Sequence, residues 1–166
     1  DLQKRDGRWD LLTDWKDWFL LAPGDPVRKR PRLQGPIDDA FLAPFLVVLP
    51  SGKSQHPSVQ EWVEFEQQHF LDRWRALMRG EARVKRDIDV NEDDINAYNL
   101  VLWGDADSNQ LVRRVLDQLP LRWDQDVVGF GGQQFPANSH VPAMIYPNPL
   151  NPRNYVTLNS GLTFRE

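Results

Sequence analysis

The pattern of apolar and polar positions predicts strands that alternate with helices. Two short runs, residues 45–49 and 100–103, are apolar throughout, which is typical of central strands covered on both faces. A polar turn and then an amphipathic segment follow each run, at residues 58–79 and 111–119. Because such strand–turn–helix units build parallel sheets, the sequence predicts an α/β fold.

The first amphipathic segment predicts a long helix with marked ends. Ser58 and Glu61 form the pattern of a capping box at its start, and Gly80 is expected to end it after Arg79. Six apolar residues are predicted to form its buried stripe: Val59, Trp62, Val63, Phe70, Trp74 and Leu77.

Shorter elements are expected between and after these units. Residues 82–90 predict a strand and residues 91–97 a short helix with acidic residues in its first turn. Asp107 or Ser108 is expected to cap the helix at residues 111–119. A hairpin is predicted around Gly131-Gly132, and two further strands at residues 143–146 and 155–158.

The beginning of the chain predicts a different kind of structure. Residues 1–12 have the pattern of a β-hairpin with its turn at Asp6-Gly7, and a proline-rich, basic stretch follows as a linker or surface strap. We therefore expect residues 1–34 to end a preceding β-rich region. Residues 35–166 are expected to form a three-layer α/β domain with a mostly parallel sheet, flavodoxin-like or Rossmann-like.

Composition narrows the range of functions. The net charge is −4 and the pI about 5.4, which argues against nucleic-acid binding despite the short basic run at residues 28–32. There is no cysteine, so disulfides and thiolate metal sites are excluded. No apolar run approaches the roughly 18 residues of a membrane span, so no membrane partner is expected.

Two loops resemble ligand motifs only in part. Residues 51–54 read Ser-Gly-Lys-Ser, like the end of a phosphate-binding loop, but Val47 stands where that motif needs its first glycine. Residues 87–93 alternate oxygen ligands like a calcium loop, but Glu92 replaces the turn glycine and Tyr98 the final glutamate. A plain turn and a capped helix start are favoured, so we expect no cofactor and no metal.

A complete catalytic motif is missing from the sequence. The three histidines, His56, His69 and His140, lack the spacing of a zinc site, and no Gly-x-Ser-x-Gly nucleophile elbow occurs. We therefore assign no catalytic residue to this chain.

Polar residues after the predicted strands suggest a ligand site instead. The turns after residues 49 and 103 should meet at one edge of a parallel sheet, where α/β folds bind ligands. The end of strand 155–158 would join them if that strand ran parallel to strand 143–146. Weak binding of a small polar molecule is the expectation, at eight candidate residues: Ser51, Gly52, Lys53, Asp105, Ser108, Asn109, Asn148 and Asn159.

Four segments in this order carry a family resemblance: residues 35–41 (GPIDDAF), 99–105 (NLVLWGD), 146–152 (YPNPLNP) and 156–166 (VTLNSGLTFRE). Together they resemble the C-terminal region of prolyl-oligopeptidase-like α/β-hydrolases, the secreted kind found in planctomycete-type bacteria. Residues 4–9 resemble the end of the β-rich part that precedes this region. The resemblance covers nearly the whole chain.

The resemblance implies that the parent protein is a serine hydrolase whose nucleophile and partners lie upstream, in a separate catalytic domain. The chain would then be a non-catalytic accessory module that packs against that domain or assists it. The alternative is an autonomous α/β domain that binds a small polar ligand. The resemblance alone implies secretion or a periplasmic location, and the sequence leaves a cytoplasmic location open.

Overall fold

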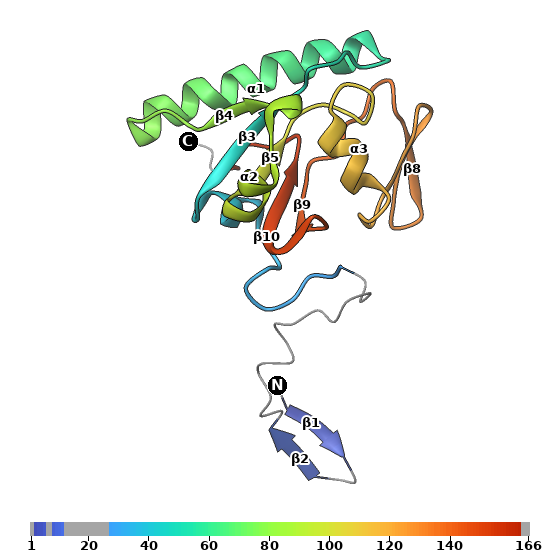
Figure 1. Ribbon diagram of the computed structural model, residues 1–166. Coiled ribbons are helices and arrows are strands. Elements are labelled where there is room, and N and C mark those ends of the chain that lie inside the picture. Colours follow the sequence, from blue (N-terminus) through green and yellow to red (C-terminus); the bar gives the residue numbers. More distant parts are fainter. Residues whose placement is uncertain (1, 6–7, 12–26, 164–166) are drawn as a thin grey trace.

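A five-stranded, mostly parallel sheet forms the centre of the fold (Figure 1). The computed structural model describes the backbone of residues 2–5 and 8–11 and all of residues 27–163. The strand order is β4-β3-β5-β10-β9. The bounds are β3 Phe45–Leu49, β4 Val84–Arg86, β5 Asn99–Leu102, β9 Met144–Asn148 and β10 Asn151–Leu158. The predicted α/β class is confirmed.

Four strands of this sheet are parallel, and the fifth is not. β3 pairs in parallel with both β4 and β5, and β10 pairs in parallel with β5. β9 instead forms an antiparallel hairpin with β10, because only two residues connect them and a parallel crossover needs about a dozen. The carboxyl ends of β3, β5 and β10 consequently share one edge of the sheet, and the end of β9 lies at the other.

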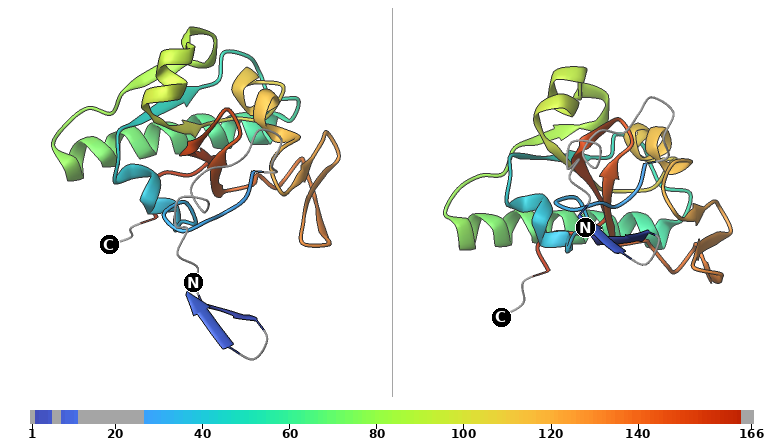
Figure 2. Two further views of the ribbon diagram at one scale, coloured as in Figure 1. Left: turned by 60° about the horizontal axis from the view of Figure 1, so that its bottom comes forward. Right: turned by 90° about the horizontal axis from the view of Figure 1, so that it is seen from below.

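Helices cover both faces of the sheet (Figures 1 and 2). α1 (Pro57–Met78) packs on one face through an aromatic-rich cluster that includes Phe41, Phe45 and Phe70. α2 (Glu92–Ala97) and α3 (Gln110–Leu116) pack on the other face against an aliphatic cluster. Because β3 leads to α1 and its neighbour β5 leads to α3, the chain leaves this strand pair toward opposite faces.

The ends of α1 differ from the prediction. His56 is the N-cap residue and makes no side-chain capping bond, whereas the Ser58 hydroxyl donates to the carbonyl of Asn138 (2.6 Å). The predicted capping box is therefore wrong. The helix ends at Met78, and its C-cap residue, which adopts a left-handed conformation (φ 55°), is Arg79 instead of Gly80.

The predicted stripe of α1 is correct only in part. Val59, Val63 and Phe70 are buried as expected. Trp74 is half-buried, and Trp62 and Leu77 are 38% and 40% exposed. The predicted stripe is too wide, because only the side chains at positions 59, 63 and 70 are buried against the sheet.

The short helices follow the prediction more closely. In α2 the Asn91 side chain accepts from the backbone of Asp94 and the Asp94 carboxylate accepts from the backbone of Asn91, which completes a capping box. In α3 the N-cap is Asn109, so the expectation of Asp107 or Ser108 is wrong. The strand predicted at residues 82–90 shrinks to β4, followed by the 3-10 turn η2 (Asp87–Asp89).

A separate three-stranded antiparallel sheet follows α3. It consists of β6 (Arg122–Trp123), β7 (Val127–Phe130) and β8 (Gln133–Pro136), in that order. The predicted hairpin is confirmed, because Gly131 and Gly132 both take positive φ in the two-residue turn between β7 and β8.

The N-terminal part contains a β-hairpin and, further along, a strap that packs on the α/β domain. β1 (Leu2–Arg5) and β2 (Arg8–Leu11) form the expected antiparallel hairpin, and its turn at Asp6-Gly7 lies outside the described residues. The later part of the proline-rich stretch packs as a strap, with Leu33 buried in the α1-side cluster and the Tyr155 hydroxyl donating to the Arg32 carbonyl (3.2 Å). The 3-10 helix η1 (Ile37–Phe41) then leads into β3.

Candidate functional site

Six of the eight candidate ligand-binding residues gather at the carboxyl edge of the sheet, and a seventh closes that edge. Residues 51–53 follow β3, and Asp105, Ser108 and Asn109 follow β5. Asn159 follows β10. Asn148 lies at the opposite edge, paired with Asn151, because β9 runs antiparallel to β10. Its predicted membership in this site is wrong.

The loops after β3 and β5 are bonded directly to each other. The backbone N–H of Gly52 donates to the carbonyl of Ser108 (2.8 Å), and the Ser54 hydroxyl donates to the Asp105 carboxylate. A Cβ atom at Gly52 would lie 2.9 Å from the carbonyl oxygen of Asp107. Glycine is therefore needed here for the close approach of two backbones.

The Asp105 carboxylate fills the place that an anionic ligand would take. Its Oδ1 accepts from the Ser108 N–H (2.8 Å), the Ser108 hydroxyl (2.8 Å) and the Asp107 N–H (3.1 Å). Its Oδ2 accepts from Ser54. The donors of Ser54, Asp107 and Ser108 are thus already satisfied by a negative charge of the chain itself, which opposes the binding of a second anion beside them. Lys53 is exposed and lies outside this network.

The two asparagines of the site are also fully occupied. Asn109 accepts from the N–H groups of Leu111 and Val112 and donates to the Trp103 carbonyl (2.9 Å). Asn159 accepts from the Gly104 N–H (2.8 Å) and donates to the Gly104 carbonyl (3.0 Å). Both side chains are buried and hold strand ends together, so the oxygen and the nitrogen of each amide already bond within the protein.

Serine, histidine and aspartate lie close together in this edge, but their hydrogen bonds are not those of a catalytic triad. The Ser54 hydroxyl bonds Asp105 directly. The His56 ring turns away and donates from Nε2 to the Gln125 carbonyl (2.7 Å). No histidine nitrogen accepts from the serine, so the arrangement does not activate a nucleophile.

A small hollow of about 180 Å³ adjoins the two loops. His56, Asp105 and Asp107 line one side and Asp124 the other. Asp124 accepts from the backbone N–H groups of Asp126 and Val127 and from Arg122, which together hold the pKa of its carboxyl below the usual value. Among the described residues, no group of three or more histidine, aspartate or glutamate side chains could hold a metal ion.

A larger cavity, of about 580 Å³, lies at the same edge on the side of α1. One stripe of α1 lines it, from Trp62 through His69 and Arg73 to Leu77, and the chain after Asn159 closes its other side. Sequence reasoning missed this site. The spacing of residues 62, 66, 69, 73 and 77 places them on one face of a helix. These residues are apolar, acidic and basic, so no hydrophobic pattern in the sequence marks that face.

The cavity wall after β10 is fixed to the fold by two contacts. Gly161 crosses the ring of Phe70 so closely that a Cβ there would lie 2.3 Å from a ring carbon. The Thr163 N–H donates to the Asp38 carboxylate (2.8 Å), and the Thr163 hydroxyl donates to the same group. The cavity is thus bounded by an ordered segment on both sides.

Comparison with protein-family models, with curated proteins and with solved structures finds no match for this chain. None of the described helices is long and apolar enough to cross a membrane.

Proposed function

We propose that this chain is a non-catalytic accessory module that packs against an upstream catalytic domain of the same protein, a secreted peptidase- or esterase-like hydrolase. The family resemblance of residues 35–41, 99–105, 146–152 and 156–166 supports the nature of the parent protein. The observation that carries the packing role is the apolar surface of α1. Secretion of the parent follows from the same resemblance.

The exposed large apolar side chains of α1, called the α1 strip below, are Trp62, Phe65, Leu77 and Met78, spread along the helix. Phe65 is 66% exposed and Met78 52% exposed. Large apolar side chains with this exposure leave hydrophobic area in water that a partner domain would cover. Single exposed apolar residues are common, but here four occur on one helix of 22 residues.

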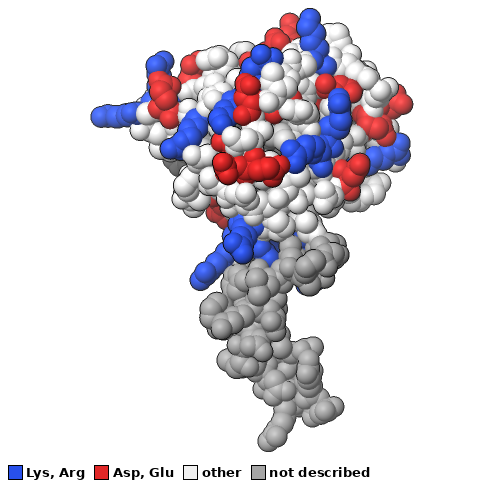
Figure 3. Space-filling model, viewed as in Figure 1, with Lys and Arg blue, Asp and Glu red and all other residues white. Residues whose placement is uncertain are grey.

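Charge supports a protein partner rather than a nucleic acid. On the face shown in Figure 3, lysine and arginine side chains alternate with aspartate and glutamate, without a continuous basic area. The saturated hydrogen bonds of Asp105 and Asn159 likewise favour the module over a small-ligand binder that uses the loop edge.

The strand order supports a flavodoxin-like variant of the α/β fold as part of this proposal. Taken in chain order, β3, β4 and β5 are arranged 2-1-3, as in flavodoxin-like sheets. The hairpin of β9 and β10 takes the place of the last two parallel strands.

Hydrogen exchange tests the proposal. The chain is expressed alone and within a longer polypeptide that includes the upstream domain, and amide exchange is followed along α1. We expect residues 62–78 to be protected additionally in the longer polypeptide. Equal exchange of this segment in both proteins would contradict docking through α1.

A pair of variants sharpens the test in the longer polypeptide. Phe65→Ser should remove the additional protection without unfolding the chain, since Phe65 lies outside both buried clusters. Ile88→Ser is the matched control, because Ile88 is 56% exposed and lies in η2, away from α1. Loss of protection by both variants, or by neither, would count against the α1 strip.

A further inference from the structure

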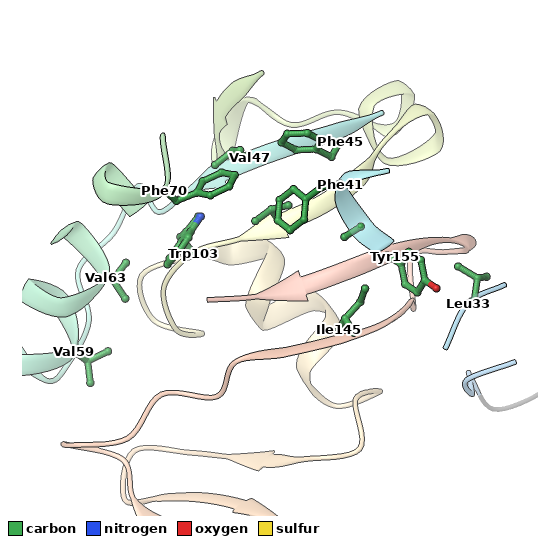
Figure 4. Close-up of a cluster of buried hydrophobic side chains, with 12 residues drawn as sticks. Leu33, Phe41, Phe45, Val47, Val59, Val63, Phe70, Trp103, Ile145 and Tyr155 are labelled. Carbon is green, nitrogen blue, oxygen red and sulfur yellow. The ribbon is translucent and has the colours of Figure 1, made fainter. Parts of the chain in front are cut away.

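The 580 Å³ cavity beside α1 has aromatic walls. The ring centroids of Trp62 and Phe70 lie 6.4 and 6.3 Å from that of Trp103, and Trp74 lies 6.2 Å from Phe70. Cavities of this size and lining bind small organic molecules with an apolar or aromatic body. Figure 4 shows Trp103 and Phe70 side by side beneath α1, with the indole nitrogen directed toward the ring of Phe70.

Two buried donors of this lining have no acceptor. Arg73 Nη2 and Trp103 Nε1 are both buried, and neither has a hydrogen-bond partner within the part of the chain that the structure describes. Trp103 is 1% exposed. Both groups can only donate. The indole N–H of Trp103 faces the ring of Phe70, whereas the flexible Arg73 side chain can turn its unpaired N–H groups toward an oxygen of a bound molecule.

The cavity lining holds one cationic side chain, Arg73, and one acidic side chain, Glu66. Glu66 Oε2 lies 3.8 Å from His69 Nδ1, one helical turn away from Arg73. Arg73 has no ion pair with any described residue, although Arg75, two positions along, pairs with Glu81. A guanidinium beside apolar walls binds carboxylates through charge-assisted hydrogen bonds.

We propose that this cavity binds a small carboxylic acid with an aromatic body, whose carboxylate is held by Arg73 and whose ring packs against the neighbouring rings of Phe70 and Trp74. The cavity shares Trp62 and Leu77 with the α1 strip, so a docked partner domain would cover part of it, and the site is tested in the chain on its own.

Titration with phenylacetate tests the site, with phenylacetamide as the neutral isostere. The indole N–H resonances of the seven tryptophans are followed by NMR, and Trp103→Phe assigns the signal of Trp103. We expect phenylacetate to shift that signal and to bind at least about tenfold more tightly than the amide. Equal binding of acid and amide, or no shift at the solubility limit of the acid, would overturn the proposal.

Two arginine variants locate the carboxylate. Arg73→Gln should weaken phenylacetate binding about tenfold and leave phenylacetamide binding unchanged. Arg75→Gln, on the same helix but outside the cavity lining, should change neither. If Arg73→Gln perturbs the fold, the comparison of acid and amide in the unchanged chain still decides. Unaltered phenylacetate binding in a folded Arg73→Gln variant would refute the role of Arg73.

Discussion

Gly52 illustrates how one residue sets the geometry of the loop edge. Its backbone lies against the carbonyls of Asp107 and Ser108, and a methyl group has no room between them. Gly52→Ala should therefore force the loops apart and lower the free energy of unfolding by about 1–3 kcal/mol, as overpacking usually does. Urea denaturation measures this loss.

Gly80→Ala is the control for this prediction. A Cβ at Gly80 would meet only the Met78 carbonyl, at 3.9 Å, and its φ is not positive. We expect its free energy of unfolding to stay within about 0.5 kcal/mol of the unchanged chain. If both alanine variants behaved alike, the contact at Gly52 would not be the constraint that the geometry indicates.

At the scale of single elements, the start of α2 makes stability depend on pH. The Asn91 N–H, and then the Lys85 ammonium at 2.6 Å, hold the pKa of Asp94 below its usual value. A lowered folded-state pKa adds stability at neutral pH, and this stability is lost as the pH falls below about 4 toward the folded-state pKa.

Asp94→Asn should remove this contribution. We expect a loss of about 1–2 kcal/mol at neutral pH, because the charge-assisted bond to Lys85 is removed while the amide oxygen still accepts from Asn91. The difference should shrink on acidification. Urea denaturation at several pH values measures it, and Asp93→Asn, exposed in the same helix turn, is the control. A difference that is independent of pH would contradict this account.

The two tryptophans of α1 should contribute unequally. The Trp74 ring packs edge-on against Phe45 at 4.7 Å and lies beside the rings of Phe41 and Phe70, whereas among the described aromatic residues the Trp62 ring pairs with Trp103 alone. Trp74→Ala should therefore cost about 2–4 kcal/mol, and Trp62→Ala about 1 kcal/mol or less. Chemical denaturation of the two variants compares them. Equal losses would mean that the sheet-facing arc of α1 is misplaced.

These elements also show how far the sequence alone predicts the fold. Apolar runs without charges predict β3 and β5 correctly, because full burial leaves a composition that loops do not share. The N-caps of α1 and α3 are His56 and Asn109, not the residues that the sequence predicts. Several adjacent polar residues could accept hydrogen bonds from the same backbone N–H groups, so the sequence does not decide among them. The edge position of β9, which moved Asn148 away from the candidate site, depends on strand pairing that no local pattern encodes.

At the scale of the whole molecule, residues distant in sequence make both the edge and the cavity. Asn159 joins β10 to β5, and Asp38 anchors Thr163 across 125 positions. The sequence predicts that polar residues follow the strands. It does not predict that the Asp105 carboxylate accepts hydrogen bonds from both loops, because these bonds depend on the exact distance between two loops that are far apart in the sequence.

The hydrogen bonds of Ser54 and His56 predict that the loop edge lacks hydrolytic activity. A nucleophilic serine needs a histidine nitrogen to take its proton, yet Ser54 donates to Asp105 and the His56 ring donates to Gln125. We therefore expect no turnover of nitrophenyl esters or peptide substrates above that of a buffer blank, and no labelling by a fluorophosphonate probe. Mass spectrometry of the treated protein reads out the labelling. A covalent adduct that Ser54→Ala removes, and that Ser160→Ala does not, would place a nucleophile at this edge and end the assignment of a non-catalytic module.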